Sequence, residues 1–231
     1  IINILDKIIL FSLYIIAYFF PISKAIIELF TTLAIVCYII KKIIQREGIP
    51  KTRLNLTILG YLALCFLSIF LSINFRTSAK TFIGKNIQEI LLFFVLTEAL
   101  NSELKVRVFL CILFSSSTLL GIDGIYQYFT HKDFIRLRPP IFVNRIFATF
   151  PTPNDFGCYL NAIIPFSVVG FFIKFRFKAV KFIFAGLFTL LFTCLVMTVS
   201  KGAWLAFMAS ALFMGVWIYS LGVFFLLLAL F

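Results

Sequence analysis

Long apolar runs separated by short polar segments dominate the chain. Eight of these runs predict helices that cross a bilayer, near residues 5–20, 25–40, 57–74, 86–100, 107–126, 154–173, 182–199 and 203–219. A spanning helix needs about 20 mostly apolar residues, whereas a lipid-facing strand needs only about ten and alternates apolar with polar side chains. The runs here are continuously apolar. The pattern therefore predicts an all-α, polytopic bundle of transmembrane helices.

A ninth apolar run begins at Leu221 and reaches the last residue, Phe231, after roughly half the length that a spanning helix needs. The first residue is Ile1 instead of a methionine. We therefore expect residues 1–231 to form a single transmembrane domain of a longer protein. The ninth helix would be completed after Phe231.

The composition agrees with a membrane protein and excludes a water-soluble one. Hydrophobic residues make up 62% of the chain, charged residues only 13%, and the mean hydropathy is +1.10. The five cysteines lie in or beside apolar runs without paired spacing, and His131 stands alone in a polar segment. The chain also lacks a glycine-rich phosphate loop. We expect no metal, no cofactor and no nucleic-acid partner.

Lysine and arginine in the loops predict the orientation, because basic loops stay on the cytoplasmic side. The segments 41–53 and 174–181 are rich in both residues, so we expect them in the cytoplasm. The outer side then also carries many cations, namely Lys24, Arg76, Lys80, Lys85, Lys132, Arg136, Arg138, Arg145 and Lys201. These cations indicate either an anionic partner, such as a phosphate or pyrophosphate, or ordinary contact with lipid headgroups.

Carboxylates inside the predicted spans allow two interpretations, because a charge at membrane depth is costly. Glu28, Glu89 and Asp123 lie within spans, and Glu98 lies near the inner end of the fourth. Each could pair with an outer arginine or lysine and fix the packing of its helix. Alternatively, one of them could take part directly in catalysis.

The first candidate site is the longest expected outer loop, residues 127–153. Arg145 precedes the segment FATFPTPNDFG, whose prolines forbid a helix and in which Asn154 or Asp155 can cap the helix that follows. The N-terminus of that helix would offer free N–H groups and a positive dipole end to an anion. A tight prolyl turn with an ordinary N-cap explains the same residues.

The second candidate site is the segment TVSKGAWLAF, residues 198–207. Lys201 lies at the expected outer turn between two uncharged spans, with Ser200 before it and Trp204 shortly after it. One interpretation is that the lysine binds an anion. The other is that it extends its side chain to the membrane interface beside an interfacial tryptophan.

Together the two segments resemble the paired signature of the O-antigen ligase and polymerase superfamily. RIFATFPTPNDFGCYL is followed about 45 residues later by SKGAWLAF. Members typically have an arginine, a Gly-Thr-Phe-like turn, Pro-Asn and a helix, and later Ser-Arg-Gly-Ala-Trp. The segment GIYQYF and the hydrophobic N-terminal helices fit as well. Two positions depart from the pattern, because Ala148 stands where a glycine is common and Lys201 replaces the usual arginine.

The resemblance implies a metal-independent glycosyltransferase in the bacterial inner membrane. It implies transfer of a glycan from an undecaprenyl-pyrophosphate carrier to a hydroxyl acceptor, such as lipid A-core, on the periplasmic side. The catalytic residues are implied to lie in a large outer loop after residue 231, and membrane lipids would surround the chain. The resemblance assigns the pyrophosphate to Arg145 and Lys201, with support from Asn154, Ser200, Arg138 and Arg136.

Other functions stay open at this point. A ligase and a polymerase of this superfamily differ in their acceptor, and the residues present do not separate them. A flippase or transporter of the lipid-linked glycan would also need outer cations. It should however carry cations along a path through the membrane, and the predicted spans contain very few. A purely structural membrane subunit is the remaining alternative.

Overall fold

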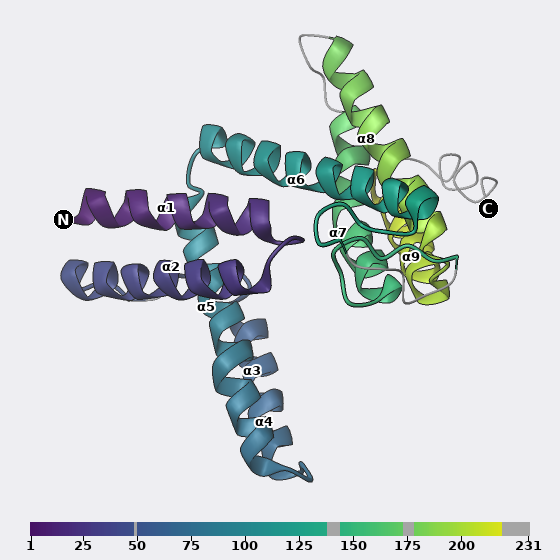
Figure 1. Ribbon diagram of the computed structural model, residues 1–231. Coiled ribbons are helices and arrows are strands. Elements are labelled where there is room, and N and C mark those ends of the chain that lie inside the picture. Colours follow the sequence, from purple (N-terminus) through teal and green to yellow (C-terminus); the bar gives the residue numbers. More distant parts are fainter. Residues whose placement is uncertain (49, 138–143, 173–177, 219–231) are drawn as a thin grey trace. The chain divides into compact units, whose positions relative to one another are not determined.

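The computed structural model describes residues 1–48, 50–137, 144–172 and 178–218 (Figure 1). All regular secondary structure in these residues is helical, which confirms the all-α prediction for the described part of the chain. The elements are α1 (Ile2–Phe19), α2 (Lys24–Gln45), α3 (Asn55–Phe70), α4 (Phe75–Thr81), the π-helix η1 (Phe82–Ile87), α5 (Gln88–Ala99), α6 (Glu103–Thr130), α7 (Pro153–Phe172), α8 (Lys178–Met197) and α9 (Lys201–Ile218).

Among the described residues, three helices are long and apolar enough to cross a membrane. They are Ile2–Phe19, Glu103–Thr130 and the Ala179–Met197 part of α8. Asn55–Phe70 and the Lys201–Met214 part of α9 are apolar but shorter. These helices indicate a membrane protein. The larger number of spans stays a prediction, and the ninth apolar run lies outside the described residues.

The fourth expected span differs from the structure in where it begins. We expected a loop up to residue 86, but the chain is helical from Phe75 to Ala99 through α4, η1 and α5. The Asn74 side chain caps this helix by accepting a hydrogen bond of 3.2 Å from the Thr77 N–H. Lysine and arginine are good helix formers, so the basic residues of this segment did not mark a loop.

The chain packs as two compact units, residues 1–112 and 113–231, which are described separately. In the first unit, α1 and α2 form an antiparallel hairpin that packs against α5 (Figure 1). Its core contains Leu13 of α1, Ala34 of α2 and Val95 of α5, all fully buried. These residues belong to the apolar runs that predicted the helices.

A cluster of charged side chains joins α1, α2 and α5 at one end of this unit. Lys41 Nζ lies 2.8 Å from a carboxylate oxygen of Asp6 and 3.1 Å from one of Glu98. Lys42 Nζ lies 2.8 Å from the other oxygen of Glu98, and the Tyr38 hydroxyl donates a hydrogen bond of 3.0 Å to the same carboxylate. Glu98 therefore pairs with lysines of the expected cytoplasmic side, and not with an outer cation.

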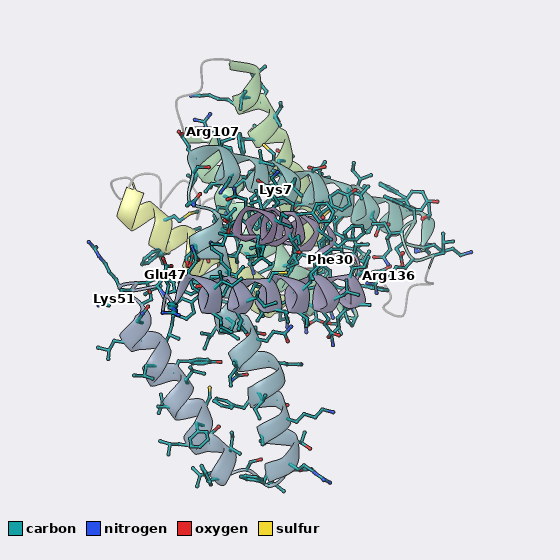
Figure 2. All side chains as sticks on the ribbon, turned by 90° about the vertical axis from the view of Figure 1, so that its left-hand side faces the viewer. Lys7, Phe30, Glu47, Lys51, Arg107 and Arg136 are labelled. Atoms are coloured by element: carbon teal, nitrogen blue, oxygen red, sulfur yellow. The ribbon has the colours of Figure 1, made fainter. Side chains whose placement is uncertain are left out.

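The helices α3 and α4 lie side by side and extend away from the α1–α2 hairpin within the same unit (Figures 1 and 2). Large apolar side chains are exposed on α3 and on η1, which continues α4. Leu56 and Leu67 of α3 are 81% and 59% exposed, and Ile83 of η1 is 65% exposed. Such a surface is unfavourable in water and suits the acyl chains of a bilayer.

In the second unit, the core forms between α6, α7, α8 and α9. Its largest fully buried side chains include Phe147 and Phe156. α7 approaches α9 closely because Gly157 has no side chain. A Cβ atom at this glycine would lie 2.6 Å from the Cβ of Ala203. The first turns of α7 and α9 therefore lie side by side, which positions the candidate site.

Candidate anion-binding site

The loop between α6 and α7 begins later than expected. α6 continues to Thr130 and α7 begins at Pro153, so the first residues of the expected 127–153 loop are helical. Neither glycine nor proline occurs between Ile125 and Thr130, so nothing in the local sequence ends the helix earlier. Proline suits the first position of a helix, where its missing N–H would have no partner within the helix.

Gln127 of α6 holds the second half of this loop. Its side chain is 2% exposed, and its Oε1 atom accepts hydrogen bonds of 2.8 Å from the Phe147 N–H and 2.9 Å from the Ala148 N–H. Ala148 has a φ angle of 47° and is fully buried. This left-handed conformation favours glycine, which is the residue expected here from the resemblance. Gln127 thus stabilises a turn that alanine adopts at a cost in strain.

Arg145 links this loop to the start of α7 and to the turn between α8 and α9. Its Nε atom donates a hydrogen bond of 2.8 Å to the carbonyl oxygen of Thr198, and its Nη2 atom donates one of 3.2 Å to Oδ1 of Asn154. The backbone N–H of Ile146 donates to the carbonyl of Met197 at 3.2 Å. The two segments singled out in the sequence are therefore in direct contact.

The turn between α8 and α9 presents Lys201 at the start of α9. Ser200 is 3% exposed and caps the helix, because its hydroxyl accepts a hydrogen bond of 3.3 Å from the Ala203 N–H. Trp204 Nε1 donates to the carbonyl of Leu195 at 3.2 Å, so the indole joins α9 back to α8. The Lys201 side chain is exposed. It has no acidic partner within 4 Å among the described residues.

The cap of α7 differs from the expectation. We expected Asn154 or Asp155 to cap this helix, but Thr152 does so, since its hydroxyl accepts a hydrogen bond of 3.2 Å from the Asp155 N–H. The same hydroxyl donates to Oδ2 of Asp155 at 2.7 Å. Thr152 and Asp155 therefore hold each other in place at the start of α7, in an arrangement similar to a capping box. Asn154 instead lies in the first turn and accepts from Arg145.

These features form a positively polarised site on the second unit. The N-terminal turns of α7 and α9 both carry the positive end of a helix dipole and N–H groups without partners inside the helix. Asn161 Nδ2 donates to the Ala203 carbonyl at 2.8 Å and fixes the two helices against each other. Arg145 and Lys201 add full charges next to these turns. The arrangement is suited to binding an oxyanion.

The structure describes five of the six site residues expected from the sequence, and it brings four of these together. Arg145, Asn154, Ser200 and Lys201 come together around the two helix N-termini, where Ser200 serves as a cap. Arg136 lies in the first half of the loop with an exposed side chain, and its N–H donates to the Asp133 carboxylate. Arg138 lies outside the described residues.

Sequence reasoning overlooked the role of α6 in holding this loop. Asp123 and Gln127 are buried one helical turn apart, and Oδ1 of Asp123 accepts a hydrogen bond of 2.7 Å from the Phe134 N–H. Each also has a buried polar atom that finds no partner in the described part of the chain, Oδ2 of Asp123 and Nε2 of Gln127. Two polar residues four apart in an apolar helix share one face, and this spacing could have predicted a shared role.

Comparisons of the chain with family models, with curated proteins and with solved structures found no match.

Proposed function

We propose that the chain takes part in glycan transfer of the O-antigen ligase type at the periplasmic face of the bacterial inner membrane. The donor is a glycan linked to undecaprenyl pyrophosphate, and the acceptor is a hydroxyl group such as one of lipid A-core. Arg145 and Lys201 bind the pyrophosphate. The observation that supports this role is the hydrogen bond from Arg145 to the Thr198 carbonyl, three residues before Lys201.

The chemistry of this transfer fits a site built from cations and helix N-termini. The acceptor hydroxyl gives its proton to a general base, and its oxygen forms a bond to the anomeric carbon of the sugar while the bond from that carbon to the pyrophosphate oxygen breaks. Negative charge therefore increases on the departing pyrophosphate. Preorganised donors stabilise such charge without rearrangement at the moment of reaction. Arginine binds two oxygens through its planar group, and lysine acts as a compact point charge.

The experiment that tests this function replaces Lys201 in cells that depend on the protein for glycan transfer. Lys201→Ala should lower transfer by roughly tenfold to a hundredfold, because losing a charge-assisted contact costs about 1.5 to 3 kcal/mol. Lys201→Arg should retain activity, since arginine keeps the charge and presents its donors in a planar fork that can contact two oxygens. Lys132→Ala, which removes an exposed lysine of the preceding loop, is the matched control. Normal transfer and normal abundance of Lys201→Ala would refute the assignment.

The same cells distinguish the alternative functions. If the chain acts in transfer, the lipid-linked donor should accumulate on the outer face of the membrane when Lys201 is replaced. Accumulation on the inner face would instead support transport of the donor. A change in glycan length without loss of attachment to lipid A-core would support the polymerase over the ligase.

A further inference from the structure

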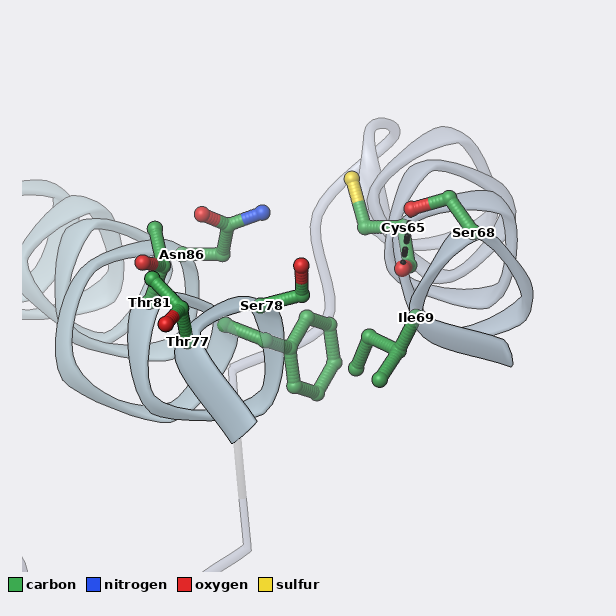
Figure 3. Close-up of a pocket in the computed structure, with 8 residues that line it drawn as sticks. Cys65, Ser68, Ile69, Thr77, Ser78, Thr81 and Asn86 are labelled. Carbon is green, nitrogen blue, oxygen red and sulfur yellow. Dashed lines mark hydrogen bonds between the residues drawn. The ribbon is translucent and has the colours of Figure 1, made fainter. Parts of the chain in front are cut away.

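A polar groove lies between α3 and the α4–η1 helix of the first unit. It has a volume of about 260 Å³, with Ile69 and Phe82 among its lining. Figure 3 shows side chains from both helices pointing into the space between them, among them Cys65, Ser78 and Asn86. The polar groups that line it are the side chains of Cys65, Ser68, Thr77, Ser78, Thr81 and Asn86.

The π-helix η1 places Asn86 in this groove. Residues four apart share a face in an α-helix, which explains why Thr77 and Thr81 both line the groove. Asn86 comes five residues after Thr81, and the i→i+5 hydrogen bonds of a π-turn bring residues five apart onto one face. π-turns are rare and occur frequently at functional sites. The wider turn at Phe82–Ile87 therefore extends one polar face along the groove.

Part of the polar lining of this groove is available to a ligand, namely the side chains of Thr77, Thr81 and Asn86. The Ser68 hydroxyl is already bonded to the Cys65 carbonyl at 2.7 Å, and the Ser78 hydroxyl to that of Ser72 at 2.6 Å. Several threonines in the other helices return their hydroxyl to the carbonyl four residues earlier, as Thr118 does to Phe114 and Thr189 does to Ala185. Thr97 bonds instead to the carbonyl three residues earlier, and Oγ1 of Thr31 has no partner among the described residues. Within the described residues, the side chains of Thr77, Thr81 and Asn86 make no hydrogen bond. Polar side chains that served only to join α3 and α4 would be bonded across the two helices.

The surroundings of the groove favour an amphiphilic ligand. Leu64 and Phe70 of α3 are 70% and 63% exposed, and Ile83 on the opposite helix is similarly exposed. The α4–η1 helix also carries three exposed cations that have no acidic partner within 4 Å among the described residues, namely Arg76, Lys80 and Lys85. A ligand in the groove would meet hydroxyls and an apolar surface, on a helix that also carries positive charge outside the lining itself.

We propose that this groove binds the headgroup of a membrane lipid in which hydroxyl groups stand next to a phosphate. The hydroxyls of the headgroup bond to Thr77, Thr81 and Asn86, and the phosphate lies against the cations of α4 and η1. The hydrocarbon chain follows the exposed apolar face of α3. This site lies in a different unit from Arg145 and Lys201, so it does not depend on the proposed glycan transfer.

Binding of defined lipids to the purified full chain in detergent tests the proposal. Phosphatidylglycerol, which has headgroup hydroxyls, should bind more tightly than phosphatidic acid, which has only the phosphate. Thr81→Val and Asn86→Leu should each weaken binding of phosphatidylglycerol by about fivefold and leave phosphatidic acid unchanged, as expected for one lost neutral hydrogen bond. Lys80→Gln should weaken both lipids. Thr77→Val provides an independent variant if either of the first two fails to fold.

Thr189→Val is the matched control, because it removes an exposed hydroxyl that bonds only within its own helix.

Two further ligands, a polyprenyl-phosphate hexose and free glycerol phosphate, identify the kind of molecule that supplies the headgroup. Tighter binding of the hexose lipid would assign the groove to a sugar-bearing lipid, and weak binding of glycerol phosphate would show that the hydrocarbon chain contributes. Equal affinity for phosphatidylglycerol and phosphatidic acid, or unchanged binding by the Thr81 and Asn86 variants, would overturn the proposal.

Discussion

The Nε atom of Arg145 donates a hydrogen bond of 2.8 Å to the carbonyl oxygen of Thr198, 53 positions later in the chain. The same guanidinium reaches Asn154 in the first turn of α7. One side chain therefore fixes the loop, the start of α7 and the turn before α9 relative to one another. This geometry makes Arg145 both a structural link and a candidate ligand for an anion.

Arg145→Lys should impair the site although it keeps the charge. An ammonium group lacks the fixed fork that lets arginine reach the Thr198 carbonyl and Asn154 together. We expect glycan transfer to decrease by about tenfold or more, which corresponds to roughly 1.4 kcal/mol. Arg107→Lys, at an exposed arginine paired with Glu103, should have no effect. Transfer at the wild-type rate in Arg145→Lys would show that the two-point contact is dispensable.

Gln127→Leu should loosen the loop that carries Arg145. The substitution leaves the buried N–H groups of Phe147 and Ala148 without an acceptor, at about 1 to 3 kcal/mol each. We expect a lower Tm in detergent and faster hydrogen exchange at these two amides. Thr118→Val is the control, because it removes a hydroxyl that bonds only to the Phe114 carbonyl of its own helix. Unchanged exchange at both amides would contradict the anchoring role of Gln127.

Ala148 should tolerate glycine and reject valine. Its φ of 47° lies in the left-handed region, where a β-branched residue adds about 1 to 3 kcal/mol of strain. The site is also fully buried, so the larger side chain adds an overpacking cost of similar size, about 1 to 3 kcal/mol. We expect a Tm near that of wild type for Ala148→Gly and a marked decrease for Ala148→Val. Equal Tm values for the two variants would argue against this conformation.

Glu98→Ala should destabilise the first unit far more than Glu28→Ala. Glu98 accepts contacts from Tyr38, Lys41 and Lys42 and is partly buried. Its removal leaves the Tyr38 hydroxyl without its acceptor, at about 1 to 3 kcal/mol, while Lys41 keeps Asp6 and Lys42 keeps Glu47. Glu28 pairs only with exposed Lys24 at 3.6 Å, and such surface pairs contribute about 0 to 1 kcal/mol. Thermal unfolding of both variants tests the difference, and similar Tm losses would contradict it.

Above neutral pH, the stabilising effect of Lys41 should persist until the lysine itself loses its proton. Burial lowers the pKa of Lys41, but hydrogen bonds with Asp6 and Glu98 outweigh it, so the pKa lies above its ordinary value of 10.5. When folding raises the pKa of a lysine, the stabilisation that the lysine provides is complete at pH values below its pKa in the unfolded chain. This stabilisation is lost as the pH rises through its pKa in the folded chain. The Tm difference between wild type and Lys41→Met should therefore be constant near neutrality and shrink above about pH 10.5. A difference that does not change with pH would exclude this titration.

Much of the architecture could be predicted from the sequence. Continuous apolar runs leave helices as the only simple way to satisfy backbone hydrogen bonds in lipid, and the described chain is all-helical. Sequence also drew attention to Arg145, Asn154, Ser200 and Lys201, because isolated polar residues beside apolar spans are conspicuous. The residues at which the helices begin and end were less predictable. The segment from Phe75 is helical although its charges favoured a loop, since lysine and arginine fit either state.

The contacts that make these residues a site required the folded chain. Neither apolar periodicity nor charge indicates that the Thr198 carbonyl accepts from Arg145, that Gln127 holds Phe147, or that Thr152 instead of Asn154 caps α7. The physical reason is that hydrophobic runs specify which segments are buried but not which helices become neighbours. That choice depends on side-chain shape at close approaches such as Gly157 against Ala203, which brings two helix N-termini together.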